Sequence, residues 1–326
     1  MRELDSWRQP QKILVYGGWY IDPELESAAP QLEIVRATSE AQALAEAVDA
    51  DAIIGSCANN LVSIAQQASW VQISAAGAER CMQTDRILDG EVILTNMQKM
   101  SAPVIAEHAV ALMLALARKL PEHINGMETA TWQKWGGEVV AAQQSVDGMT
   151  VLVAGLGGIG TEVARRASAL GMRVIGTRRS SRSGPVFVDY VGLSDELFEL
   201  AAQADVVVNA LPLTDATDRL FDTEFFAAVK PGAYYVSIGR GKTTDTDDLV
   251  AALESGKIAG AGLDVTDPEP LPAGHSLWKM QNVIITSHTA DAGVRPERHY
   301  ALLRANLRRF VAGEALFNVV DPERGY

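Results

Sequence analysis

Three residues in the second half of the chain carry side chains that could perform acid–base and electrostatic chemistry. Arg240, Glu269 and His288 each follow a short apolar run. In open α/β sheets, ligands bind outside the carboxyl ends of the strands, where loops present side chains above a rigid scaffold. A guanidinium, a carboxylate and an imidazole brought together there could hold an anion and supply a proton while a carbonyl group is reduced.

Each of these residues also has a simpler structural interpretation. Arg240 could be half of a surface ion pair, and Glu269, which precedes Pro270, could be a turn residue. His288 could be a strand-end histidine with satisfied hydrogen bonds. Only a fold that gathers the three side chains would support catalysis, so the elements that position them decide between these interpretations.

A glycine-rich turn lies earlier in the chain. It has the spacing G-x-G-x-x-G, directly follows the apolar run 150–154, and opens a helical pattern that reaches residue 170. In this context the spacing predicts a dinucleotide site, because the glycines let the pyrophosphate approach and the helix N-terminus offers amide N–H groups to it. The alternative is a plain strand-to-helix turn. The predicted contacts are Gly155, Gly157, Gly158, Ile159 and Gly160.

The end of the next predicted strand indicates which dinucleotide is preferred. Folds that bind NAD generally place an acidic residue there, about twenty residues after the glycines, to bind the ribose 2′-hydroxyl. This chain has arginines and hydroxyl residues instead, over residues 177–183. Guanidinium groups grip a 2′-phosphate bidentately, so NADP is expected to be preferred, with NAD as the second option. A solvated arginine loop is the alternative. The predicted contacts are Thr177, Arg178, Arg179 and Ser180.

The wider pattern predicts two α/β units with parallel sheets. Short apolar runs alternate with helical stretches, and the later runs are continuously apolar, as expected when helices cover both faces of a parallel sheet. Strands are expected at 13–16, 32–35, 52–54, 71–73 and 92–94 in the first unit, and at 150–154, 173–175, 205–209, 233–238, 258–263 and 283–286 in the second.

Two predicted helices bear on how the units assemble. Residues 103–118 are apolar on nearly every side, which predicts a helix buried between domains or subunits and favours a homodimer. Within it, Glu107 and His108 are interpreted as helix-packing residues. The segment 296–311 predicts a helix that packs back on the first unit.

Composition argues against several classes of protein. Lys+Arg 28 against Asp+Glu 41 gives a formal net charge of −13 at pH 7, which opposes binding to nucleic-acid phosphates. The longest uncharged apolar run, 109–117, is too short to span a membrane, and the first residues do not form a signal peptide, so a cytoplasmic location is expected. Cys57 and Cys81 stand alone and are interpreted as free thiols in a reducing compartment, without a metal site.

The motifs around the three candidate residues, taken in order, resemble those of the D-isomer-specific 2-hydroxyacid dehydrogenase family, and glyoxylate/hydroxypyruvate reductases in particular. The resemblance rests on residues 106–109, 209–217, 237–241, 261–265, 269–270 and 287–290. It implies two doubly wound α/β domains. A Rossmann dinucleotide-binding domain, residues 102–290, would be inserted in a flavodoxin-like substrate domain formed by residues 1–101 and 291–326.

The resemblance also implies roles for individual residues. His288 would donate a proton, Arg240 would hold the substrate anion and the developing oxyanion, and Glu269 would orient the imidazole and favour its cationic form. Ala76 and Gly77 would join Arg240 and His288 in binding substrate. Further cofactor contacts would come from Leu211, Pro212, Thr217, Ile238, Asp264 and Ala290.

The expected reaction is the reduction of a small 2-oxoacid, such as glyoxylate, hydroxypyruvate or pyruvate, to a D-2-hydroxyacid with NADPH. Ser287 and Asp291 stand where the family usually has proline and glycine, so the choice of 2-oxoacid stays open. Trp132 and Trp135 lie where related enzymes bring an aromatic side chain toward the active site, with core packing as the alternative. Two other functions share the fold: a non-catalytic NAD(P)H sensor that binds a partner, and another Rossmann enzyme such as an amino-acid dehydrogenase.

Overall fold

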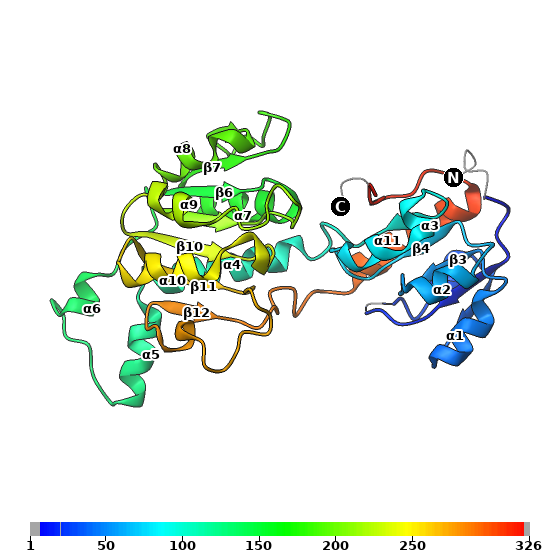
Figure 1. Cartoon of the computed structure of the whole chain (residues 1–326), viewed down its shortest axis with the longest axis horizontal. Coiled ribbons are helices and arrows are strands. Elements are labelled where there is room, and N and C mark those ends of the chain that lie inside the picture. Colours follow the sequence, from blue (N-terminus) through cyan, green and yellow to red (C-terminus); the bar gives the residue numbers. More distant parts are fainter. Residues whose placement is uncertain (1–6, 20, 323–326) are drawn as a thin grey trace. The chain divides into compact units, whose positions relative to one another are not determined.

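The computed structural model describes residues 7–19 and 21–322 and contains two compact α/β units (Figure 1). Unit 1 contains the residues up to Ser101 together with those from Val294 onward, and unit 2 runs from Ala102 to Gly293. The expected fold class, two parallel-sheet α/β domains with one inserted in the other, is confirmed. The chain returns to unit 1 at residue 294 rather than at 291.

Unit 1 is built on a five-stranded sheet of order β2-β1-β3-β4-β5, in which every neighbouring pair is parallel. This is the strand order of flavodoxin-like sheets. Its elements are β1 (Lys12–Val15), η1 (Leu25–Ala28), β2 (Glu33–Arg36), α1 (Glu40–Ala47), β3 (Ala52–Ile54), α2 (Asn59–Ile64), β4 (Trp70–Gln72), η2 (Glu79–Gln83), α3 (Asp85–Leu88), β5 (Ile93–Thr95) and α11 (Glu297–Ala312).

Alternate side chains of the unit 1 strands pack on opposite faces of the sheet. Leu14 and Ile53 belong to the core formed with α1, α2 and α3, whereas Ile13 belongs to the core formed with α11. The rings of Trp70 and Phe310 lie with their centroids 5.0 Å apart in this second core. The C-terminal helix therefore covers the sheet of unit 1, as its apolar face predicted.

Unit 2 is built on a seven-stranded parallel sheet of order β12-β11-β10-β9-β6-β7-β8. The order reverses at β6, where a doubly wound sheet binds its ligand. Its elements are α4 (Ala102–Ala117), α5 (Leu120–Glu128), α6 (Glu138–Ala141), β6 (Thr150–Ala154), α7 (Gly158–Ala169), β7 (Arg173–Thr177), β8 (Tyr190–Gly192), η3 (Ser194–Glu196), α8 (Leu197–Ala201), β9 (Val206–Asn209), α9 (Thr223–Ala228), β10 (Ala233–Ser237), η4 (Gly241–Thr243), α10 (Thr246–Glu254), β11 (Ile258–Leu263), η5 (Ser276–Lys279) and β12 (Val283–Ile285).

Helices cover both faces of the unit 2 sheet (Figure 1). Val151 and Val153 of β6 face α4 and α7, while Leu152 and Ala154 face α8, α9 and α10. A Cβ atom at Gly262 of β11 would lie 2.9 Å from Leu112 Cβ, so this glycine lets α4 approach the sheet closely. Burial of α4 against its own sheet accounts for the apolar character of that segment.

Two features of unit 2 were not predicted. The short edge strand β8 begins with the exposed Tyr190 and has no apolar run that would signal it. Helices α5 and α6 lie away from the sheet (Figure 1), and Trp132 and Trp135 between them are 89% and 95% exposed. Core packing is therefore the wrong interpretation of these two tryptophans within the described chain.

The expectation of free thiols is also wrong, because Cys57 and Cys81 form a disulfide with Cα atoms 5.5 Å apart. Cys57 lies in the loop after β3, and Cys81 lies in η2 after β4. Because β3 and β4 are neighbours in the sheet, the segments that follow them begin side by side, although 24 positions separate the two cysteines in sequence. Spacing alone could not reveal this contact. The inference of a reducing compartment from free thiols loses its basis.

We predict that replacing both cysteines by serine lowers the free energy of unfolding of unit 1 by about 3 kcal/mol, because closing a loop of this length restricts the unfolded chain. Chemical denaturation of the wild type and the double variant, both without reductant, measures the difference. Thiol titration of the unreduced, denatured wild type should detect no free cysteine. Two reactive thiols per chain would contradict the disulfide.

Candidate functional site

The glycine turn between β6 and α7 has the shape that a dinucleotide requires. Gly155 has a φ of +93°, which disfavours any side chain. A Cβ atom at Gly160 would lie 2.0 Å from the Gly155 carbonyl oxygen, so this glycine is needed for α7 to pack on the turn. Gly157 is the N-cap of α7, and a Cβ atom there would meet no described protein atom within 4 Å. The space in front of α7 therefore fits a pyrophosphate, which the helix N-terminus would stabilise.

Thr177, at the end of β7, is buried beneath this turn. Its hydroxyl accepts a hydrogen bond from the Gly155 N–H at 3.2 Å, and its carbonyl oxygen accepts one from the Leu156 N–H at 2.8 Å. The side chain of Thr177 therefore fixes the position of the glycine turn, and its contact with the cofactor stays a prediction.

Arg178 follows Thr177. Its Nε atom is buried and has no hydrogen-bond partner among the described residues. A buried N–H group without a partner is unusual, and a guanidinium is best satisfied by an anionic oxygen such as that of a phosphate. Arg179 and Ser180 are exposed in the same loop. Arg182 is engaged elsewhere: its Nη2 lies 2.7 Å from Glu196 Oε1, and this contact, with the Leu193 N–H, lowers the pKa of the Glu196 carboxyl to about 2.

The loop after β9 borders the glycine turn. A Cβ atom at Gly155 would lie 3.0 Å from Leu211 Cδ2. The Thr217 hydroxyl donates to the Pro212 carbonyl oxygen at 2.7 Å, which closes this loop on itself. Ile238, after β10, is buried. These predicted cofactor residues lie in loops that follow β9 and β10. Strand β9 lies beside β6, on the side where the strand order reverses, and β10 lies beside β9.

Glu269 and His288 are in direct contact, with Glu269 Oε1 2.6 Å from His288 Nδ1. Their side chains are 42% and 46% exposed, so the pair can meet a ligand. His288 has a φ of +53°, a left-handed conformation that is uncommon for residues other than glycine and is often found at functional sites. Because Nδ1 faces the carboxylate, Nε2 is the ring nitrogen that can donate a proton to a substrate.

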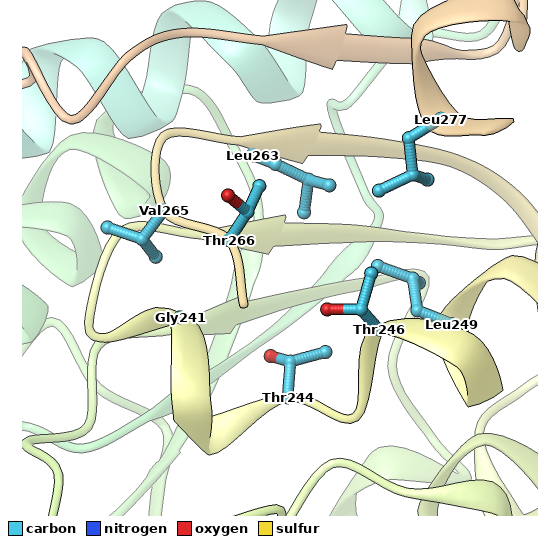
Figure 2. Close-up of a pocket in the computed structure, with 8 residues that line it drawn as sticks. All are labelled: Gly241, Thr244, Thr246, Leu249, Leu263, Val265, Thr266 and Leu277. Atoms are coloured by element: carbon cyan, nitrogen blue, oxygen red, sulfur yellow. The ribbon is translucent and has the colours of Figure 1, made fainter. Parts of the chain in front are cut away.

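Arg240 follows β10, the strand beside β11, and β11 lies beside β12. The three candidate residues therefore follow three adjacent strands. A Cβ atom at Gly241 would lie 1.8 Å from the Thr266 carbonyl oxygen, and Figure 2 shows this turn beside the Thr266 segment that leads to Glu269. The Arg240 Nη1 donates to the Gly239 carbonyl oxygen at 2.9 Å. The structure joins Glu269 to His288 and places Arg240 on the neighbouring strand end.

Asp264, predicted to contact the cofactor, is buried and holds the loop that carries His288. Its carboxylate accepts hydrogen bonds from the Thr289 and Ala290 N–H groups, both at 3.0 Å, and from the Thr286 hydroxyl at 2.6 Å. Sequence reasoning missed Thr286 and treated His108 only as a packing residue. The structure places His108 Nε2 2.9 Å from the Thr286 hydroxyl oxygen. A titratable side chain within an otherwise apolar helix was the available signal.

The predicted substrate residues Ala76 and Gly77 lie in unit 1, in the loop after β4. Ala76 is exposed, and its carbonyl oxygen accepts a hydrogen bond from Asn96 Nδ2 at 2.7 Å. The Met97 N–H donates to the Ala75 carbonyl oxygen at 2.9 Å. These bonds fix the loop from the β5 side, and substrate binding by Ala76 and Gly77 stays a prediction.

Within residues 7–19 and 21–322, no three His, Cys, Asp or Glu side chains are grouped so that they could hold a metal ion. None of the described helices combines the length and apolar character needed to cross a bilayer.

Comparison with known sequences yields a match over most of unit 2. Residues 110–290 match a family model described as D-isomer specific 2-hydroxyacid dehydrogenase, NAD binding domain. The human glyoxylate reductase/hydroxypyruvate reductase is 40% identical over 205 residues, which is 62% of this chain. The matched segment spans 61% of the length of that human enzyme.

Solved structures match the chain nearly throughout. A D-isomer specific 2-hydroxyacid dehydrogenase from Xanthobacter autotrophicus, in complex with NADPH and MES, superposes with a TM-score of 0.83 at 27% identity and covers 98% of this chain and 100% of its own. An NADPH-dependent glyoxylate/hydroxypyruvate reductase from Sinorhizobium meliloti, in complex with NADP and sulfate, gives a TM-score of 0.82 at 25% identity, with 97% and 100% covered.

We predict that Gly157→Ala separates cofactor binding from stability. Its methyl group would meet no protein atom, so the melting temperature should stay close to that of the wild type. The methyl group would occupy space needed by the pyrophosphate, so the Kd for NADPH, measured by calorimetry, should rise about tenfold or more. Wild-type affinity in this variant would contradict the placement of the cofactor.

Gly160→Ala is the matched comparison. Here the methyl group would meet backbone at 2.0 Å, so the variant should lose about 2 kcal/mol or more of unfolding free energy.

Proposed function

Because the chain belongs to the D-isomer specific 2-hydroxyacid dehydrogenase family and is thereby an NAD(P)-dependent dehydrogenase, we propose that it reduces small 2-oxoacids to D-2-hydroxyacids. Glyoxylate, hydroxypyruvate and pyruvate are the proposed substrates, and NADPH is the proposed reductant. The observation that carries this proposal is the 2.6 Å contact between Glu269 and His288, at strand ends next to that of Arg240.

His288 is proposed as the proton donor. NADPH, when bound, would supply a hydride for the carbonyl carbon, and the carbonyl oxygen would gain negative charge as the hydride is transferred. An imidazolium Nε2–H aimed at this oxygen would neutralise the charge as it forms. The Arg240 guanidinium would stabilise the same oxygen and the substrate carboxylate through charge-assisted hydrogen bonds. Ala76 and Gly77 are proposed to bind the carboxylate through their backbone N–H groups.

Glu269 is proposed to act on the imidazole. Its carboxylate would accept a hydrogen bond from Nδ1, which fixes the orientation of the ring, and its negative charge lies beside the ring whose Nε2 would donate to the substrate. The pair is half-exposed, so solvent screens part of this charge. A moderate gain in proton donation, rather than an absolute requirement, is the expected contribution.

The preference for NADP rests on the unpartnered Nε of Arg178. Arg178 lies at the end of β7, where the ribose of a bound dinucleotide is expected, and Arg179 and Ser180 are exposed in the same loop. The other residues proposed to bind the cofactor lie in the glycine turn and in the loops after β9 and β10. A 2′-phosphate would satisfy the buried guanidinium N–H group.

A homodimer is part of the proposal. Met127 of α5 is 80% exposed, and Trp132 and Trp135, in the segment between α5 and α6, are 89% and 95% exposed. Large exposed apolar side chains are enriched at protein contacts. A second copy of the chain is the proposed partner.

The function is tested by following NADPH absorbance at 340 nm with a panel of 2-oxoacids, with and without ammonia. We expect oxidation of NADPH with at least one of the three small acids, without ammonia. Absorbance that stays constant with every acid would favour a non-catalytic sensor, and turnover only with ammonia would favour an amino-acid dehydrogenase.

For Glu269→Gln, we predict that kcat for reduction falls on the order of tenfold. The amide keeps a hydrogen bond to the ring but removes the negative charge beside it. Steady-state kinetics measure kcat in the variant and in the wild type. Glu254→Gln, at an exposed position of α10, is the matched control and should keep the wild-type kcat. A wild-type kcat in Glu269→Gln would show that the Glu269 charge does not assist His288.

For Arg178→Asp, we predict that the ratio of kcat/KM with NADPH to that with NADH falls about a hundredfold, since a charge-assisted bond is lost and repulsion is added. Steady-state kinetics with both cofactors measure the ratio. Arg173→Asp makes the same charge change at the exposed start of the same strand and should leave the ratio unchanged. An unchanged ratio in Arg178→Asp itself would rule out its role in selecting the cofactor.

A further inference from the structure

We propose that His108, on α4, is a positioning residue that fixes the His288 loop through the Thr286 hydroxyl and the Asp264 carboxylate. This inference rests on the proposed function in so far as His288 is the proton donor. His108 itself would touch neither substrate nor cofactor.

The contacts form a continuous chain from α4 to the His288 loop. His108 Nε2 lies 2.9 Å from Thr286 Oγ1, and Thr286 Oγ1 lies 2.6 Å from Asp264 Oδ1. The Asp264 carboxylate accepts the N–H groups of Thr289 and Ala290 at 3.0 Å each. The backbone carbonyl oxygen of Asp264 accepts the His288 N–H at 2.8 Å. Asp264 therefore holds the backbone at His288 and at the two positions after it.

The direction of the hydrogen bonds follows from the number of protons. Thr286 has one hydroxyl proton. The Asp264 carboxylate can only accept hydrogen bonds, so Thr286 donates this proton to it in the short contact between them. The Thr286 oxygen must then accept from His108, so His108 carries a proton on Nε2. This N–H group orients the Thr286 hydroxyl toward Asp264. The Nε2 to Asp264 Oδ1 separation of 3.7 Å keeps the imidazole near the same carboxylate.

Without the His108 donor, the Thr286 hydroxyl would be free to rotate, and its bond to Asp264 would weaken. His288 holds a left-handed backbone conformation that surrounding contacts must maintain. A small displacement of the loop would move the imidazole relative to Glu269 and to the substrate. Displacements of about 1 Å can cost on the order of a hundredfold in rate.

Packing of α4 does not depend on the His108 side chain. The helix is anchored by buried apolar residues that belong to the unit 2 core, including Ala109, Leu112 and Leu116. The imidazole of His108 is itself 25% exposed. Replacement of His108 should therefore disturb the hydrogen-bond chain while the helix stays in place.

The test compares His108→Leu with His108→Gln. Leucine removes the donor, so kcat for 2-oxoacid reduction should fall about tenfold or more, with an unchanged KM for NADPH and little change in melting temperature. Glutamine carries an amide N–H that can reach Thr286, so this variant should keep most of the wild-type kcat. Equal loss in both variants, or wild-type kcat in His108→Leu, would overturn the proposal.

Thr286→Val is the second test, because it removes the hydroxyl group that links His108 to Asp264 in the series of hydrogen bonds. If both residues act through one path, the double variant His108→Leu/Thr286→Val should be no slower than Thr286→Val alone. Independent, multiplying losses would contradict a single path.

Hydrogen exchange separates failure of this inference from failure of the proposed function, since it needs no turnover. The Thr289 and Ala290 amides should exchange at least several-fold faster in His108→Leu than in the wild type and near the wild-type rate in His108→Gln. If the wild type reduces no 2-oxoacid, the proposed function fails. The exchange rates of the Thr289 and Ala290 amides still show whether His108 holds the His288 loop. Unchanged protection in His108→Leu would overturn the inference.

Discussion

The contact between the Glu269 carboxylate and the His288 imidazole is the interaction on which the functional account depends. The two residues are 19 positions apart in sequence, and their side chains meet at 2.6 Å. Parallel strands make this possible, because β10, β11 and β12 are neighbours and all end at one edge of the sheet. A carboxylate at this distance can orient the ring so that Nε2 is free to meet a substrate, which the proposed proton donor to a carbonyl oxygen requires.

Several contacts that involve no catalytic side chain keep this pair in place. Asp264 binds the backbone of the His288 loop, and Thr246 donates to the Asp267 carbonyl oxygen at 2.6 Å in the loop that leads to Glu269. The turn at Gly241 packs directly on Thr266 and leaves no room for a methyl group. The exposed pair is thus built on a rigid, buried base, as expected for a site that must hold its geometry.

The fold class could be predicted from the sequence because it follows from local patterns, and the candidate site residues were inferred from patterns of the same kind. Continuous apolar runs identify buried parallel strands, and the spacing of Gly155, Gly157 and Gly160 identifies a dinucleotide turn. The positions of Glu269 and His288 after their strands were readable in the same way. These positions indicated only that Glu269 and His288 share one edge of the sheet. The direct hydrogen bond between the two side chains is seen only in the structure.

Other features depend on contacts between segments that no local pattern encodes. The Cys57–Cys81 disulfide forms because two neighbouring strands deliver their loops together, although neither cysteine belongs to a motif. Arg182 looked equivalent to Arg178 in sequence, but Glu196 from the following 3-10 helix binds it. His108 was interpreted as a packing residue because its hydrogen-bond partner, Thr286, lies 178 positions away in sequence.

The most direct test of the central claim is a crystal structure of the protein with NADP and a 2-oxoacid analogue such as oxamate. The account predicts that His288 Nε2 and the Arg240 guanidinium both lie about 3 Å from the keto-equivalent oxygen of the analogue, while Nδ1 keeps its contact with Glu269. An imidazole directed away from that oxygen, or an Arg240 side chain that reaches neither the oxygen nor the carboxylate, would contradict it.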